Sequence, residues 1–148
     1  MVMRTFLLLL LGAITASAIP SQRDTLAAAK RDAQGVYTAA QRTPDKAKFA
    51  EAISRLKAVG DLVVSANNAA LSAIKPGYPI DIKSQQARQS WDKKMDDIRR
   101  TLSGANREVA AFVAPSEMTP AGIRAVDALV RSIDKAIEVH HTSCQNIR

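Results

Sequence analysis

The sequence predicts an all-α fold, an antiparallel up-down-up-down four-helix bundle with long second and third helices. Apolar residues recur in steps of three and four along most of the chain, which is the spacing of one face of an α-helix. Asn-Gly and Asp-Gly turns, which are typical of β-hairpins, are absent. Breaks that contain proline divide the chain into four periodic segments, and mostly short connections place successive helices antiparallel.

The first helix is expected over about residues 21–41. Ser21 and Asp24 have the spacing of a capping box, in which the two residues satisfy each other's backbone N–H groups. One face of this helix carries the apolar residues Leu26, Ala29, Ala33, Val36, Tyr37 and Ala40.

The second helix is expected to begin with Thr43 as its cap and Pro44 in the first helical position. An N–H at that position has no partner within the helix, so proline loses no hydrogen bond there. Residues 75–77 contain a proline that ends it. Asn67 lies on the apolar face, so we expect it to hydrogen-bond across the bundle. The other residues of this face are Phe49, Ile53, Leu56, Gly60, Val63, Ala70 and Ile74, with Ala52, Val59, Ala66 and Ala73 beside them.

Residues 76–83 form the longest expected loop, because two prolines and a glycine oppose a helix there. Tyr78, Ile80 and Ile82 are apolar for a loop. We expect them to plug one end of the bundle or to form a lid.

The third helix is expected from near Ser84 to about Ala114, with Gly104 as the place for a kink. Its apolar face consists of Trp91, Met95, Ile98, Leu102, Ala105, Val109 and Phe112.

The fourth helix is expected to begin at Thr119 and Pro120, which repeat the order of cap and proline. The tail from Thr142 onward shows no recognised period, and we expect it to fray. The apolar face consists of Ile123, Val126, Val130, Ile133, Ile137 and His140.

Residues 1–18 have the three parts of a secretory signal peptide. Arg4 supplies a positive charge, an apolar stretch begins at Phe6, and residues 16–18 are small enough for cleavage. The stretch has about ten residues, whereas a membrane span needs about twenty. We therefore expect a secreted, extracellular protein whose residues 19–148 form a single helical domain.

The charge of the chain favours anionic partners. The formal net charge is +7, and loss of Arg4 leaves +6. Such a surface attracts acidic lipid headgroups and other anionic surfaces. The third helix carries many of the basic residues, including Arg99 and Arg107. No run of five like charges occurs and aromatic residues are few, so nucleic acid is not an expected partner.

No set of residues predicts catalysis, a cofactor or a metal site. His140 and His141 are adjacent, so their side chains leave a helix about 100° apart. His140 and Cys144 would supply two ligands, whereas structural zinc takes four. Cys144 is the only cysteine, and in an oxidising compartment it is a candidate for an intermolecular disulfide and a homodimer.

Many positions on the apolar faces are alanine or glycine, and this pattern has two interpretations. The helices pack closely, or they stay apart and leave an apolar cavity that binds lipid or another apolar ligand. The candidate lining residues of such a cavity, which are equally the best candidates for a filled core, are Phe49, Ile53, Val63, Trp91, Met95, Ile98, Phe112 and Val130.

Four features make the chain resemble a known family: the signal peptide, an early Arg23-Asp24, alanine-rich helices, and the segment 58–74, which begins Ala-Val-Gly-Asp-Leu. The chain resembles the fungal hydrophobic-surface-binding protein A family, related to cell-wall galactomannoproteins, over most of its mature length. The resemblance implies binding of apolar surfaces or of fatty acids in a helical cavity, and it assigns no binding residue. The chain differs from the family in its greater basicity, its lower Ser/Thr content and Cys144.

Two functional hypotheses follow. The first is a secreted, non-enzymatic protein that binds lipid or another apolar ligand or surface. The second is a secreted interaction, effector or matrix protein that acts through its surface and has a filled core.

Overall fold

The computed structural model describes residues 21–43, 45–73, 82–113 and 119–147. These residues form four helices: α2 (Arg23–Arg42), α3 (Lys46–Ser72), α4 (Ile82–Val113) and α5 (Pro120–Asn146). Their lengths are 20, 27, 32 and 27 residues, and no strand occurs in the described ranges. The predicted all-α four-helix bundle, with long second and third helices, is confirmed.

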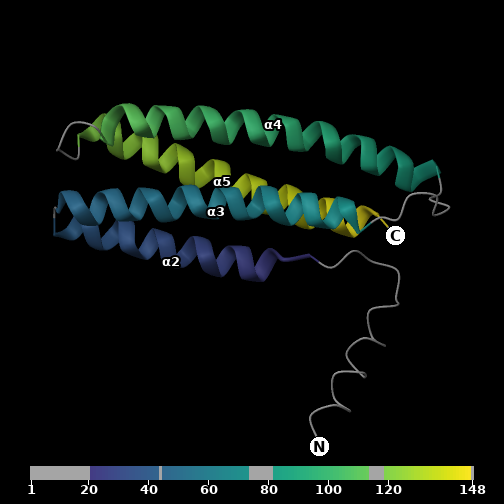
Figure 1. Cartoon of the computed structure of the whole chain (residues 1–148), viewed down its shortest axis with the longest axis horizontal. Helices are drawn as coiled ribbons and strands as arrows, with labels where there is room; N and C mark the ends of the chain where they lie inside the picture. Colours follow the sequence, from purple (N-terminus) through teal and green to yellow (C-terminus); the bar gives the residue numbers. More distant parts are fainter. Residues whose placement is uncertain (1–20, 44, 74–81, 114–118, 148) are drawn as a thin grey trace, which may run out of the picture.

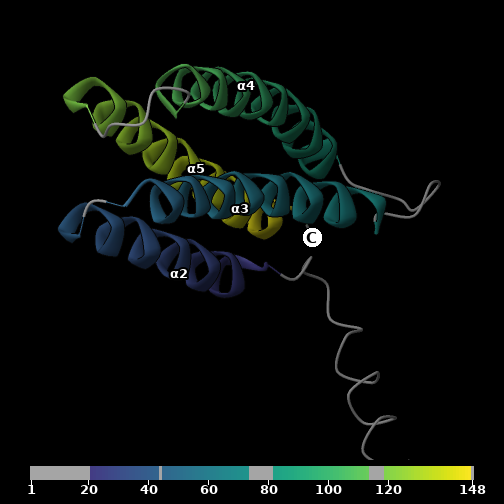
Figure 2. The same ribbon diagram turned by 60° about the vertical axis from the view of Figure 1, so that its left-hand side comes forward.

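The helices α2 and α4 lie on opposite sides of the bundle, with α3 and α5 between them (Figures 1 and 2). Contacts join α2 to α3 and α5, and α4 to the same two helices. Gln22 at the start of α2 bonds His140 near the end of α5, which in turn contacts Asn67 near the end of α3. The start of α2 and the ends of α3 and α5 therefore lie together.

Two helices begin with a side-chain cap. The Thr119 hydroxyl oxygen accepts a hydrogen bond from the Gly122 N–H at 3.1 Å, and Pro120 follows it, as predicted. The predicted cap of α3 was wrong. Asp45, not Thr43, is the cap, and its carboxylate accepts from the N–H groups of residues 47 and 48 at 2.8 and 3.4 Å. A carboxylate at a helix N-terminus is also favoured by the helix dipole.

The start of α2 differs from the predicted capping box. Gln22 occupies the cap position and its side chain makes no capping bond. Ser21 instead accepts a hydrogen bond from the Arg23 N–H at 3.2 Å, one residue earlier than the box requires.

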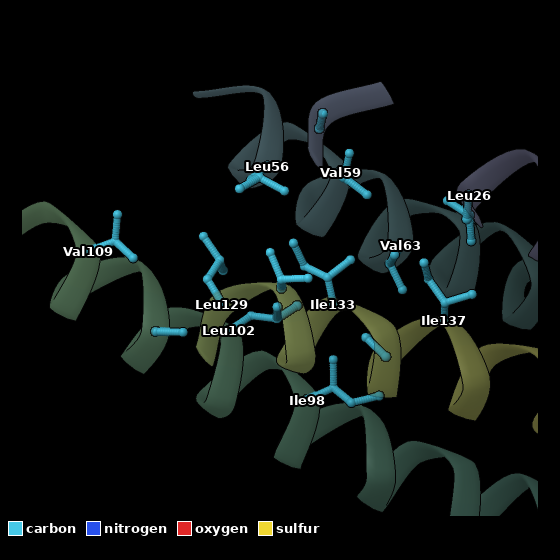
Figure 3. Close-up of a cluster of buried hydrophobic side chains, with 14 of the residues drawn as sticks. Leu26, Leu56, Val59, Val63, Ile98, Leu102, Val109, Leu129, Ile133 and Ile137 are labelled. Atoms are coloured by element: carbon cyan, nitrogen blue, oxygen red, sulfur yellow. The ribbon is translucent and has the colours of Figure 1, made fainter. Parts of the chain in front are cut away.

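The apolar faces meet in one core that runs along the bundle. Figure 3 shows side chains from all four helices converging there, among them Leu26, Leu56, Leu102 and Ile133. Burial of each such side chain stabilises the fold by about 1.5–3 kcal/mol before the entropy of ordering is subtracted. Alanines on α2, α3 and α5 let these helices approach closely, and Ala40, Ala52 and Ala136 are fully buried.

The chain after Thr142 does not fray, so that expectation was wrong. Helix α5 continues to Asn146, and Cys144 and Ile147 are buried in the core. The steps from Ile137 to residues 140, 144 and 147 continue the spacing of three and four. The sequence analysis followed this period as far as His140 and missed its continuation, because the next position is a cysteine rather than an aliphatic residue.

The expected signal peptide and most of the expected lid lie outside the described residues. Tyr78 and Ile80 are among the residues not described, whereas Ile82 begins α4 and so belongs to a helix. None of the helices that the structure describes combines the length and the apolar content required to cross a bilayer.

Candidate functional site

The predicted lining residues lie in the core rather than around one distinct opening. Seven of the eight are at most 8% exposed, and the side chain of Phe112 lies outside the described set. They come from α3, α4 and α5 and belong to the same cluster as the rest of the core: Phe49, Ile53, Val63, Trp91, Met95, Ile98 and Val130.

A groove between α3 and α4 is a candidate binding site. Its volume is about 340 Å³. Gly60 lies in it and supplies no side chain, and a Cβ added there would lie 3.7 Å from Leu102 Cδ2. The apolar residues are Gly60, Val64, Leu102 and Ala110, and the polar ones are Asp61, Arg99, Ser103, Asn106 and Arg107.

Most of the polar residues of this groove come from α4, and Asp61 comes from α3. The Arg99 guanidinium donates to Asp96 Oδ1 and to Asn68 Oδ1, both at 3.0 Å, and so bridges α4 to α3. Asn106 Oδ1 is buried and accepts no hydrogen bond from the described residues. Arg107 makes no ion pair within the described ranges and remains available to an anion.

A second groove, with a volume of about 270 Å³, lies between α4 and α5. Ile98 and Val139 provide apolar surface, and Lys94 and Lys135 provide positive charge. Ile98 is the only predicted lining residue found in either groove. Sequence reasoning missed both grooves because a groove depends on the spacing between helices. The only sequence signal was Gly60, which lies in the groove between α3 and α4.

A polar cluster, which we call the polar junction, joins Gln22 to the buried residues Asn67, Trp91 and His140. The Trp91 indole N–H donates to Asn67 Oδ1 at 2.9 Å, and Asn67 Nδ2 donates to the carbonyl of Val63 at 2.9 Å. His140 Nδ1 lies 3.2 Å from the same Asn67 oxygen. The prediction that Asn67 bonds across the bundle is confirmed.

The partners of His140 determine its tautomer. The backbone N–H of Gln22 donates to His140 Nε2 at 3.3 Å, so this nitrogen must be an acceptor. The hydrogen is therefore on Nδ1, from which it is donated to the Asn67 oxygen. Burial lowers the pKa of the His140 imidazole, and the neighbouring His141 lowers it further. The ring is thus held neutral.

Cys144 is not arranged as a nucleophile. Burial raises the pKa of its thiol, which disfavours the reactive thiolate. Its sulfur lies 3.8 Å from both ring nitrogens of His140, and both nitrogens already have other partners. A disulfide to another chain would require the end of α5 to move outward, because Cys144 has no exposed surface.

Tyr37 is buried near the opposite end of α2. Its ring lies 5.9 Å from that of Phe49, between centroids, and its hydroxyl has no hydrogen-bond partner among the described residues. Burial, together with the charge of Asp127, raises the pKa of Tyr37 to about 12.

Comparisons of the chain with known proteins found no related protein. No protein-family model, curated protein or solved structure matches the chain. Within the described residues, no group of three or more His, Cys, Asp and Glu side chains could hold a metal ion.

Proposed function

We propose that this protein is a secreted, non-enzymatic binder of an anionic amphiphile, a molecule with an apolar chain and a carboxylate or similar head. The binding site is the groove between α3 and α4. The observation that carries the proposal is the combination of an apolar floor and arginines in one groove. Its volume of about 340 Å³ lies at the lower end of the range of about 300–1,000 Å³ for small-molecule sites.

The two sides of the groove suit the two parts of such a ligand. The apolar chain lies against Val64, Leu102 and Ala110, and the head lies near Arg107. Arg107 has no competing ion pair within the described ranges, unlike Arg99. The net charge of +7 adds a general attraction for anions.

The non-enzymatic part of the proposal is supported by how the reactive side chains are used. Both ring nitrogens of His140 have structural partners, and His141 Nδ1 lies 3.0 Å from Ser21 Oγ. The Cys144 thiol is buried with a raised pKa. The secreted part rests on the signal peptide pattern of residues 1–18.

Calorimetric titration with oleate and with uncharged oleyl alcohol tests the site. Val64→Gln should weaken binding of both probes by about tenfold or more, since it places an amide on the apolar floor. The matched control is Leu62→Gln, two residues away on α3 but outside the groove, which should bind as the wild type does. Equal affinities for the two variants would place the site elsewhere.

A second pair of variants tests the head group. Arg107→Gln should weaken oleate binding and leave oleyl alcohol unchanged, because only oleate carries a charge. Arg100→Gln is the control, since Arg100 pairs with Asp97 and lies outside the groove. Native mass spectrometry of protein secreted from a eukaryotic host then tests secretion, with Ile19 as the expected first residue, and any retained ligand.

One observation favours the alternative, a secreted protein that acts through its surface. Leu62 is 51% exposed, the only large hydrophobic side chain exposed within the described ranges. Of the described core positions that could have lined a cavity, only Ile98 borders either groove. If Leu62→Gln abolishes binding to a partner protein while no variant changes binding of oleate, the surface function is supported instead.

A further inference from the structure

Both histidines of the chain contact the start of α2. His140 Nε2 accepts the N–H of Gln22, the cap residue, at 3.3 Å. His141 Nδ1 lies 3.0 Å from the hydroxyl of Ser21. The side chain of Gln22 makes no capping hydrogen bond. The backbone N–H of Gln22 is instead satisfied by His140, which lies near the far end of the sequence.

The geometry around His140 has room for only one protonation state. One ring nitrogen faces a donor, the Gln22 N–H, and the other faces an acceptor, Asn67 Oδ1. A second ring proton would sit on Nε2 and point at the Gln22 N–H. The N-terminus of α2 also carries a partial positive charge, which opposes a cation placed there.

We propose that the polar junction is a pH-sensitive latch: protonation of His140 breaks its bond to Gln22 and releases the start of α2 from the bundle. Neutral His140 holds α2 against α3 and α5. The imidazolium repels the end of α2 and can no longer accept its N–H.

The titratable and charged groups near His140 are few, and His140 is the residue whose protonation operates the latch. On α5 the titratable neighbours are His141 and the Cys144 thiol. On α2, Arg23 follows Gln22 in the chain and pairs with Glu138 of α5 at 3.4 Å. Asn67 of α3 contacts His140, and Trp91 of α4 donates to the same Asn67 oxygen; neither residue carries a charge.

The direction of the pH dependence follows from the lowered pKa. His140 in the unfolded chain takes up a proton near the ordinary value of about 6.5, and folded His140 does so only at lower pH. Its contribution to stability is therefore complete above about pH 6.5. It is lost as the pH falls below that value, at up to about tenfold in the folding equilibrium per pH unit until the folded pKa is reached.

Two measurements on the full-length protein without its signal peptide test the latch. An NMR titration should show that His140 takes up its proton below about pH 6.5. Hydrogen exchange should show that the amide of Leu26, which closes the first turn of α2 on the Gln22 carbonyl, loses protection over the same pH range. If His140 titrates at or above the ordinary value, or if protection of Leu26 is unchanged, the proposal is overturned.

A pair of variants separates the two histidines. In His140→Gln the amide can still accept from Gln22 and donate to Asn67, but it does not titrate, so unfolding between about pH 7.5 and pH 5.5 should lose most of its pH dependence. In His141→Gln the wild-type pH dependence should remain. If His141→Gln flattens the profile and His140→Gln does not, His140 is not the latch. If His140→Gln fails to fold, the wild-type titration decides.

Discussion

The starts of α2 and α3 solve the same physical problem in different ways. Both helices leave backbone N–H groups unsatisfied in their first turn. Asp45 caps α3 with its own carboxylate, directly before the helix. The first N–H at the start of α2 is satisfied by His140, which lies 118 residues away along the chain. The side-chain acceptor at the start of α3 is therefore local, whereas the start of α2 combines a local acceptor, Ser21, with a distant one, His140.

This difference predicts how each start responds to change. A local cap contributes a fixed amount to one helix. A cap from another helix depends on every contact that orients it, and Asn67 and Trp91 orient His140. Damage to the polar junction should thus cost more than damage to a local cap.

The largest effect is expected for Asn67→Leu. This change leaves the N–H groups of Trp91 and His140 buried without an acceptor, so the free energy of unfolding should fall by about 2–4 kcal/mol. Urea unfolding measures the loss. Ser65→Ala is the control, because Ser65 is exposed, lies two residues away on α3, and its side chain has no hydrogen bond with the described residues. If the two variants lose equal stability, the junction does not determine how α2 is held.

The fold was predictable from the sequence because apolar periodicity is a local property. The faces that contain Leu56, Met95 and Ile133 lie in the core as the period requires. The junction was only partly predictable. Asn67 stood out as a polar residue on an apolar face, but its partners on α4 and α5 depend on how the helices align. The groove beside Gly60 depends on helix spacing in the same way.

A smaller effect is expected at the local cap. Asp45→Ala should lower the free energy of unfolding by about 1 kcal/mol, because two N–H groups of α3 lose their acceptor. Thr43→Ala should change it by less than about 0.5 kcal/mol, although the sequence favoured Thr43 as the cap. Thermal unfolding followed by circular dichroism distinguishes them. A larger loss for Thr43→Ala would restore the sequence-based assignment.

The smallest effect is expected for the ion pair that also joins α2 to α5. Lys30 Nζ lies 2.6 Å from Asp134 Oδ1, and the two side chains are 17% and 51% exposed. Solvent screens such a pair, so Lys30→Gln should cost about 0.2–1 kcal/mol, and added salt should reduce the difference further. Urea unfolding at low and high salt measures this cost, with Arg31→Gln as the exposed neighbouring control.

If Lys30→Gln costs as much as Asn67→Leu, surface charge rather than the buried junction holds α2 to α5, and the comparison between the two helix starts fails. The expected order follows from burial, because the hydrogen bonds of Asn67 to Trp91 and His140 are buried, whereas the ion pair is partly exposed and competes with solvent.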